Sequence, residues 1–325
     1  MKNLNDLYPL TFNPIYKEKI WGGNKINKTL RRSDAPNRLC GESWEISTVK
    51  DNVSTVSNGS LEGLPLDLVI SYFKEDLVGK RNYMEYKDSF PLLIKFIDAQ
   101  QDLSIQVHPD NELAMKRHGC LGKTEMWYIM EAEEGAEIIN GFSKRIEKDS
   151  YFDIFDQSDS IYNKQKVEAG DVIFIPAGTV HAIGSGIMLA EIQQSSDITY
   201  RIHDYDRKDD QGKLRELHLE HAKDAINFVD TKSYLKHTDE DAFPEVVSCP
   251  FFTTNYLNMK EPEIRNYADI DSFVVYMVVD GSAQVKSGSH WITLGKGEVC
   301  MIPACHNYTE IRPLSPLKML EVYNY

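Results

Sequence analysis

The stretch Gly170-Asp-Val-Ile-Phe-Ile-Pro-Ala-Gly-Thr-Val-His181 combines a short strand pattern, a proline–glycine turn and a histidine, and the chain repeats this order later. The second occurrence is Gly297-Glu-Val-Cys-Met-Ile-Pro-Ala-Cys-His-Asn-Tyr308. Upstream of each, an apolar run leads to a glycine turn, at Gly135 and at Gly281. Such a repeat indicates a duplicated structural unit. The sequence therefore predicts two copies of one β unit, with Tyr308 at the position of His181.

Short strands dominate the rest of the pattern. Runs rich in β-branched and aromatic residues, several of them alternating, predict strands at 92–98, 103–108, 125–130, 136–141, 171–176 and 187–194. Short strands at this spacing are typical of antiparallel sandwiches and barrels. We therefore expect a mainly β fold of two barrels with a few helices, in which the second barrel is a degenerate copy.

Helices are the minority in this pattern. They are predicted at 65–73, at 110–118 with Gly119 as the stop, and at 213–229. The last follows a charged stretch and is expected to connect two domains. We place the first domain at 1–240, with the catalytic groups, and the degenerate copy at 241–325.

Composition excludes several classes of protein. The 325 residues include 36 Lys plus Arg and 50 Asp plus Glu, for a net charge of −14, with 42% hydrophobic residues. This is globular composition, and the negative charge argues against nucleic-acid or anionic-membrane partners. No signal peptide or spanning run is evident, and the five cysteines are scattered, so we expect a cytoplasmic protein with reduced thiols.

Alternation along two predicted strands places polar side chains together on one face of each, because side chains two apart point the same way. Those of the first strand are Ser104, Gln106 and His108, and those of the second are Lys123, Glu125 and Trp127. Charged groups on an inward face are costly to bury unless they are paired or coordinate a cation. These two rows are therefore candidate site residues.

A metal site is the first interpretation of this group. The form G-x5-P-x-G-x2-H runs a strand into a tight turn that presents His181 at a barrel mouth. Together Gln106, His108, Glu125 and His181 would give two imidazole nitrogens and two oxygens, a set that suits Zn²⁺, with Mn²⁺, Fe²⁺ or Co²⁺ possible. The alternative is a hairpin histidine that is only hydrogen-bonded. The second copy has Tyr308 for His181 and the region near Phe273 for Glu125, so we predict that it is metal-free.

Several motifs resemble the type I mannose-6-phosphate isomerases, which are zinc-dependent cupins. They are QVHPD (106–110), GKTEMWYI (122–129), PAGTVHAIG (176–184) and ITYRIHDYDR (198–207), with KIWGGNKI (19–26) and GESWEIS (41–47) resembling the opening of that family. The resemblance implies cupin-type jelly-roll barrels, a place in the compact bacterial subgroup, and interconversion of mannose 6-phosphate and fructose 6-phosphate through a cis-enediol.

The resemblance also implies roles for single residues. It makes Gln106, His108, Glu125 and His181 the zinc ligands and places Arg201 beside the reacting carbons. It lines a pocket for a small sugar phosphate with Lys123, Lys95, Ser104, Trp21, Glu45, Glu191 and Asp197. Trp21 is equally well interpreted as an aromatic plug of the barrel. No pattern in the chain indicates an oligomeric state.

The group that moves the carbon-bound proton stays open at this point. Lys123 lies two residues from a metal ligand and is one candidate base, or else a fixed cation for the phosphate. A metal-bound hydroxide and the carboxylates of Glu45, Glu191 or Asp197 are the competitors. Two other functions remain as alternatives: a non-catalytic sugar-phosphate-binding cupin that keeps its metal, and an Fe²⁺ oxygenase, against which the four-ligand set argues.

Overall fold

The computed structural model describes residues 7–155, 159–208, 211–229, 233–238 and 244–324. Its internal contacts divide the chain into two units. Unit 1 contains residues 1–15, 44–94 and 238–325, and unit 2 contains residues 16–43 and 95–237. Each unit is assembled from separate segments of sequence. The division of the chain at residue 240 into two contiguous domains stays a prediction.

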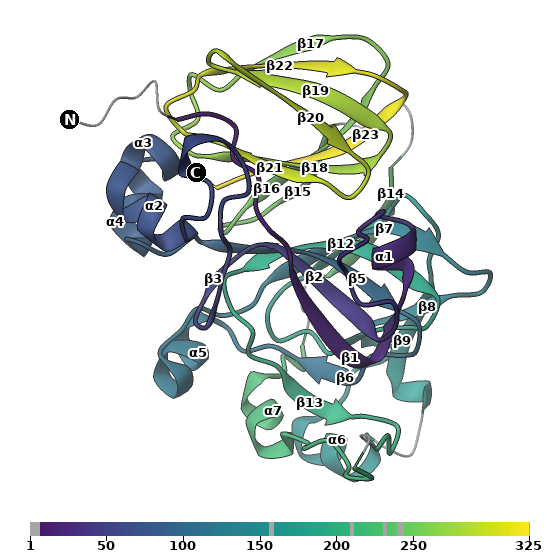
Figure 1. Cartoon of the computed structure of the whole chain (residues 1–325). Helices are drawn as coiled ribbons and strands as arrows, with labels where there is room; N and C mark the ends of the chain where they lie inside the picture. The colour runs from purple at the N-terminus through teal and green to yellow at the C-terminus, as the bar shows by residue number, and fades with distance from the viewer. Residues whose placement is uncertain (1–6, 156–158, 209–210, 230–232, 239–243, 325) are drawn as a thin grey trace. The chain divides into compact units, whose positions relative to one another are not determined.

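Two antiparallel sheets carry the strands of unit 2 (Figure 1). The larger has the order β1-β2-β5-β12-β7-β10-β14 and the smaller β13-β6-β11-β8-β9. The strands are β1 (Ile15–Gly23), β2 (Cys40–Ile46), β5 (Leu92–Ala99), β6 (Ile105–Val107), β7 (Glu125–Ala132), β8 (Glu137–Phe142), β9 (Tyr162–Lys166), β10 (Asp171–Ile175), β11 (His181–Ile183), β12 (Ile187–Gln194), β13 (Tyr200–His203) and β14 (Tyr234–His237). Every strand that the sequence predicts is present, with ends that differ by a few residues.

Unit 1 contains a second pair of sheets, green to yellow in Figure 1. Their orders are β15-β16-β23-β18-β21 and β17-β22-β19-β20. The strands are β15 (Glu245–Ser248), β16 (Thr253–Met259), β17 (Glu263–Asn266), β18 (Val274–Asp280), β19 (Ser282–Ser287), β20 (His290–Gly295), β21 (Val299–Ile302), β22 (Tyr308–Pro313) and β23 (Leu317–Tyr323), and β3 (Thr48–Val49) pairs with β4 (Asn52–Val53).

The predicted duplication is confirmed by the strand order. The run β5-β12-β7-β10 matches β16-β23-β18-β21, and β6-β11-β8-β9 matches β17-β22-β19-β20. We call the first set of eight strands the first barrel and the second set the second barrel. An apolar cluster that includes Trp127, Ile138 and Ile173 fills the first, and one that includes Tyr276 and Val285 fills the second.

The register shifts two of the expected equivalences by one residue. Ile175 pairs with Glu125, and the corresponding Ile302 pairs with Val274, which is therefore the counterpart of Glu125. Tyr308 is 58% exposed, whereas the next residue, Thr309, is fully buried. Because a one-residue slip turns a side chain to the other face of a strand, Thr309 rather than Tyr308 has the inward position of His181.

Helices and turns complete the units. The helices are α1 (Lys25–Lys28), α2 (Leu66–Phe73), α3 (Glu75–Val78), α4 (Lys80–Tyr86), α5 (Asn111–His118), α6 (Lys148–Ile154), α7 (Leu219–Ala225) and the 3-10 turns η2 (Gly59–Leu61) and η3 (Asp159–Ile161). At α5 the Asp110 side chain accepts a hydrogen bond from the Leu113 N–H at 2.9 Å, and Gly119 ends the helix at φ 66°. The predictions of α2 and α5 are confirmed.

The helix predicted at 213–229 is wrong over much of its length, since only α7 forms there. The segment before α7 is instead hydrogen-bonded to β13. The His218 N–H donates to the Arg201 carbonyl at 2.7 Å, and the Arg201 N–H donates to His218 Nδ1 at 3.1 Å. The Arg215 side chain binds Asp204. These contacts replace the helical hydrogen bonds that the apolar spacing suggested.

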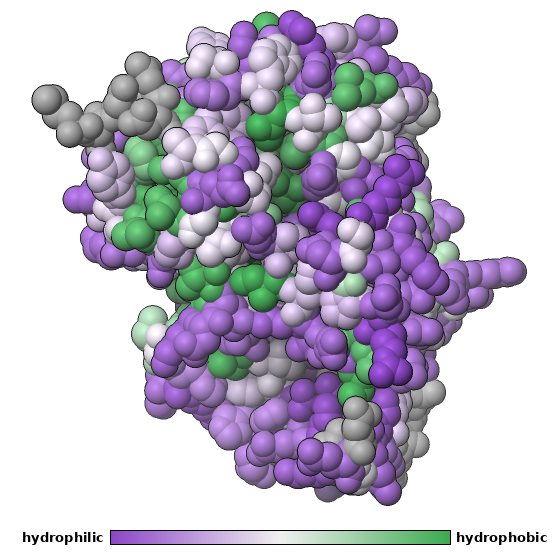
Figure 2. All heavy atoms as spheres, in the orientation of Figure 1, coloured by the Kyte–Doolittle hydropathy of each residue, from purple (hydrophilic) through white to green (hydrophobic). Residues whose placement is uncertain are grey.

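The molecular surface is hydrophilic over most of the face shown in Figure 2, and hydrophobic side chains gather over α2 and α4. The exposed ones there are Leu68, Tyr72 and Met84. Among the described residues, no helix has the length and apolar character that crossing a membrane requires.

Candidate active site

Three buried side chains of the first barrel converge on one point. His108 Nε2 and His181 Nε2 are 3.1 Å apart. The two oxygens of Glu125 lie 3.5 Å from His108 Nε2 and 3.4 Å from His181 Nε2. His108 follows β6, while Glu125 and His181 are the first residues of β7 and β11. All three are at most 1% exposed.

The backbone fixes which nitrogen of each imidazole faces the centre. His108 Nδ1 is 2.9 Å from the Ile198 carbonyl, and His181 Nδ1 is 2.8 Å from the Thr179 carbonyl. A carbonyl only accepts, so each Nδ1 carries the proton and donates it. The two Nε2 lone pairs then face one another, an arrangement that a cation between them stabilises.

The donor set fits a divalent metal ion. Glu125 Oε1 is buried and has no hydrogen-bond partner among the described residues. Gln106 adds an amide whose nitrogen is 3.3 Å from His181 Nε2, and whose oxygen lies 3.4 Å from Ser104 Oγ. A rotation of the amide by half a turn exchanges these atoms, so the Gln106 oxygen can face the ion. Two nitrogens and carboxylate and amide oxygens suit Zn²⁺ and its neighbours.

Burial keeps the two imidazole ligands neutral, which is the form that binds a metal ion. It lowers the pKa of His108 well below its usual value, with Lys123 adding to the effect, and lowers the pKa of His181 to about 4. Both imidazoles are therefore neutral near neutral pH. Burial raises the pKa of Glu125 to about 7, against the opposing pull of Lys123.

Lys123 reaches the same centre. Its Nζ is 3.0 Å from His108 Nε2 and donates to Glu125 Oε2 at 2.5 Å. The side chain is buried, at 4% exposed. The polar face that the sequence predicts for Lys123 and Glu125 is therefore present, and it places an amine against two of the proposed ligands.

A buried ion pair lies on the neighbouring strands. Lys95 Nζ donates to Glu191 Oε2 at 2.7 Å, and Trp127 Nε1 donates to Glu191 Oε1 at 3.0 Å. Burial raises the pKa of Glu191, but Lys95 and Lys123 outweigh it and bring the pKa down to about 2. Glu191 is thus a fixed carboxylate, and it neutralises the charge of Lys95.

Arg201 lies beside the ligand strand. In the ladder between β13 and β6 it pairs directly with Gln106, so the two side chains share a face. Its Nη1 donates to the Glu216 carbonyl at 2.7 Å, while its buried Nε has no partner among the described residues. Burial lowers the pKa of Arg201, and the neighbouring Arg215 adds to this.

A cluster beside Arg201 contains Arg207, which the sequence offers as a cation for the phosphate, and two residues that no sequence pattern indicated, Asp204 and Arg215. Asp204 is buried and binds both Arg207 and Arg215. Arg215 lies in the segment that was predicted as helix, and the hydrogen bonds of His218 with Arg201 and an isolated bridge between Lys208 and Leu214 bring it near. The backbone carbonyls of Thr179 and Ile198 were missed as well, because no side-chain pattern marks a carbonyl.

Three further predicted pocket residues are Trp21, Asp197 and Glu45, of which Trp21 and Glu45 are buried. Trp21, at 4% exposed, packs in the apolar cluster with Trp127 and Leu103, as the plug interpretation expects. Asp197 is exposed. Glu45 is buried on β2. Their roles in binding substrate stay predictions.

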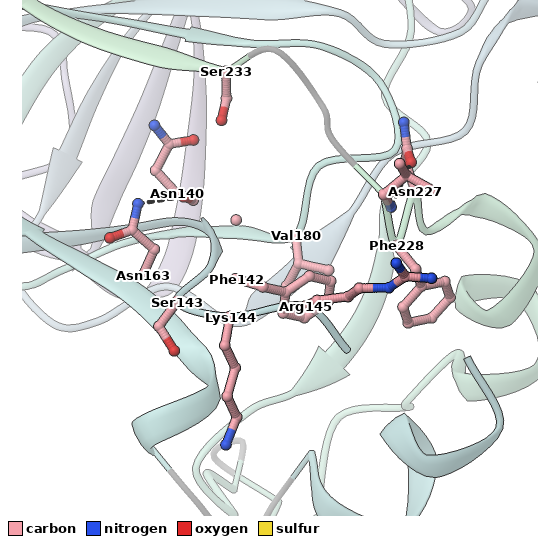
Figure 3. A pocket seen from close by; sticks show the side chains of 12 residues that line it. Asn140, Phe142, Ser143, Lys144, Arg145, Asn163, Val180, Asn227, Phe228 and Ser233 are labelled. Carbon is pink, nitrogen blue, oxygen red and sulfur yellow. Dashed lines mark hydrogen bonds between the residues drawn. The ribbon is translucent and has the colours of Figure 1, made fainter. Parts of the chain in front are cut away.

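A separate cavity of about 500 Å³ opens elsewhere in unit 2 (Figure 3). Its lining includes Asn140, Phe142, Val180, Asn227 and Phe228. None of the predicted site residues lines it. The cavity is therefore distinct from the cluster of His108, Glu125 and His181.

Comparisons with known proteins agree on one family. The family described as "Phosphomannose isomerase type I, catalytic domain" matches residues 10–150. The mannose-6-phosphate isomerase of Streptococcus mutans is 38% identical over 303 residues, covering 91% of this chain and 92% of its own. The mannose-6-phosphate isomerase ManA of Bacillus subtilis is 35% identical, covering 91% and 93%. The crystal structure of a mannose 6-phosphate isomerase from Bacillus subtilis superposes with a TM-score of 0.85 at 32% identity, covering 98% of this chain and 100% of its own.

Proposed function

The chain belongs to the type I mannose-6-phosphate isomerase family, and we propose that it interconverts mannose 6-phosphate and fructose 6-phosphate at the site of His108, Glu125 and His181. It is an aldose–ketose isomerase with two cupin-type barrels. The observation that carries the assignment of the site is the approach of His108 Nε2 and His181 Nε2 to 3.1 Å, with an unpartnered Glu125 oxygen beside them.

We propose Zn²⁺ as the ion, held by His108, His181, Glu125 and the oxygen of Gln106. When bound, such an ion supplies Lewis acidity that stabilises negative charge on substrate oxygens. The donor set carries no thiolate, and it leaves the remaining coordination to the substrate. The chain itself orients the two imidazoles toward the ion, since each Nδ1 is fixed by a backbone carbonyl.

Lys123 is the base that the geometry favours for moving the proton between C1 and C2. Its amine contacts two of the proposed metal ligands, so a substrate bound at the ion would lie within its reach. Two of the competing carboxylates are less suited. Glu191 is tied to Lys95 and Trp127 and is a weak base, because its pKa is about 2. Asp197 is exposed, while Glu45 is buried and stays an alternative base.

Arg201 supplies fixed positive charge for the enediol. Its place opposite Gln106 puts the guanidinium beside the ligand row, and its unpartnered Nε leaves a donor for a substrate oxygen. The substrate is a small sugar phosphate, and Arg201 with Arg207 are cations that support the binding of its phosphate.

We infer that the protein works in the cytoplasm. All five cysteines are free, at Cys40, Cys120, Cys249, Cys300 and Cys305, as expected of a reducing compartment.

The test is isomerisation of mannose 6-phosphate by the purified protein before chelation, after chelation and after Zn²⁺ is restored. Activity that disappears and returns with the metal supports the proposal. A folded, zinc-loaded protein that binds mannose 6-phosphate without turning it over would instead support a non-catalytic sugar-phosphate-binding function. Activity that persists in metal-free protein would contradict the metal assignment.

A further inference from the structure

Gln193 is a fully buried residue on the site face of the first barrel. It lies on β12 directly opposite Glu125 in the ladder with β7. Opposed residues of an antiparallel pair share a face, so its side chain lies on the same side as Glu125. Glu191, two residues earlier, confirms this face, because it accepts a hydrogen bond from Trp127 across the same ladder.

Among the described residues, only the nitrogen of the Gln193 amide has hydrogen-bond partners. Its Nε2 donates to the Ser196 carbonyl at 2.5 Å and to the Gln194 carbonyl at 3.0 Å. Both acceptors are carbonyls, so the nitrogen must be the atom that faces them. Its Oε1 is buried and has no hydrogen-bond partner among the described residues.

An unpartnered buried carbonyl is unfavourable, because it has lost its hydrogen bonds to water without replacing them. A leucine or methionine would fill the same space without that penalty. The role of the amide therefore lies with its nitrogen, whose two hydrogen bonds hold the turn that follows β12. The turn also bonds to itself, since the Ser196 N–H donates to the Gln194 carbonyl at 2.7 Å.

The turn from Gln194 to Ile198 carries the acceptor for a proposed metal ligand. Its Ile198 carbonyl is 2.9 Å from His108 Nδ1. Gln193 thus lies beside Glu125 and secures the segment that orients His108. Groups that orient a ligand in this way change metal affinity by about 10–100-fold when they are removed.

We propose that Gln193 is a positioning residue of the metal site, whose amide nitrogen holds the 194–198 turn so that the Ile198 carbonyl directs His108 toward the ion. The inference rests on the proposed function. It assigns to Gln193 no contact with the substrate, and its effect passes through the orientation of His108.

The experiment compares Zn²⁺ affinity of the metal-free wild type and Gln193→Met, by competition with a chromogenic chelator far below the melting temperature. Methionine keeps the length and bulk but removes the donor. We expect about tenfold weaker binding or more. A residue with a purely structural role would lower the melting temperature and leave the Zn²⁺ affinity of the folded protein unchanged. Affinity within twofold of wild type overturns the inference.

Two further variants keep the test decisive. Gln193→Asn retains an amide but is one methylene too short to reach both carbonyls, so weaker Zn²⁺ binding is expected even if the methionine variant fails to fold. Ser195→Ala is the matched control, because it removes a partly buried hydroxyl of the same turn and leaves both carbonyls that Gln193 binds. Its affinity should equal that of wild type, and an equal loss in Ser195→Ala would overturn the specific role of Gln193.

Zn²⁺ binding by the wild type distinguishes failure of the proposed metal site from failure of the positioning role of Gln193. If the wild type binds no Zn²⁺, the proposed metal site itself fails. If the wild type binds Zn²⁺ and the Gln193 variants bind it equally well, only the positioning role fails.

Discussion

In the first barrel Glu125 stands opposite Ile175, while the second barrel has Val274 at the same point, opposite Ile302. The second difference lies on the smaller sheet of each barrel. His181 pairs with Gln106 in the first, whereas Thr309 pairs with Arg265 in the second. An arginine therefore occupies the ladder position of a proposed metal ligand, and the strand order around it is the same.

The second barrel satisfies its buried acid internally. Glu321, opposite Tyr276 as Glu191 is opposite Trp127, accepts two hydrogen bonds from Arg265, each at 3.0 Å. Asn255 donates to it at 2.7 Å and Tyr267 at 2.5 Å. Both carboxylate oxygens are thus partnered.

The first barrel leaves its donor atoms open. Two Nε2 lone pairs and Glu125 Oε1 face a common point, with no partner for that oxygen among the described residues. The shared fold therefore does not make the site. Glu191 and Glu321, at equivalent positions, are each held by a side-chain cation, Lys95 and Arg265. The first barrel adds a second buried acid, Glu125, beside two histidines, where the second barrel has Val274.

The largest effect expected is at the equivalent pair His181 and Thr309. His181→Ala should lose bound metal and reduce isomerisation by about a thousandfold or more, because Lewis-acid stabilisation is worth several kcal/mol. Thr309→Ala is the matched change in the second barrel and should leave metal content unchanged. Metal analysis of both purified variants checks this, and full occupancy in His181→Ala would refute the ligand assignment.

Arg265→Met should be the most destabilising change in the second barrel. It leaves the buried Glu321 without its cation, at a loss of about 3–5 kcal/mol in the free energy of unfolding. Adding Glu321→Gln should recover part of that loss, since the uncompensated charge is then gone. Denaturant unfolding of both variants measures this, and a single variant as stable as wild type would show that the pair is not the internal cation site described above.

Arg201→Ala probes strand β13, which has no counterpart among the described strands of the second barrel. The variant should keep its metal and lose about a hundredfold or more in turnover, as when a positioned donor to a developing oxyanion is removed. Metal content and steady-state kinetics together separate the two effects. Turnover near that of wild type would remove Arg201 from the chemistry.

The smallest effect is expected at Tyr308. The aligned sequences place it at the His181 position, but it is 58% exposed and faces away from the interior. Tyr308→Phe should therefore change stability by no more than about 0.5 kcal/mol and leave metal content as it is. A loss of metal or of several kcal/mol in this variant would restore the unshifted equivalence.

Much of the fold could be predicted because it depends on local signals. The repeated glycine-to-proline stretches predicted the duplication, and alternation placed His108, Glu125 and Lys123 on inward faces. The helix expected at 213–229 was wrong because spacing alone cannot show that Arg201 bonds to Glu216 and His218, or that Arg215 bonds to Asp204. Arg201 itself came from a family resemblance, since nothing local places it opposite Gln106.

The sequence by itself determined the strand pattern, the duplicated unit and the chemical types of the metal-ligand candidates. Only the tertiary structure decided that two Nε2 atoms meet, that Thr309 replaces Tyr308 as the counterpart of His181, and that Gln193 holds the turn behind His108. The reason is physical. Side-chain alternation follows from backbone geometry within one strand, whereas the distance between atoms on different strands depends on ladder register, which the packing of the whole barrel sets.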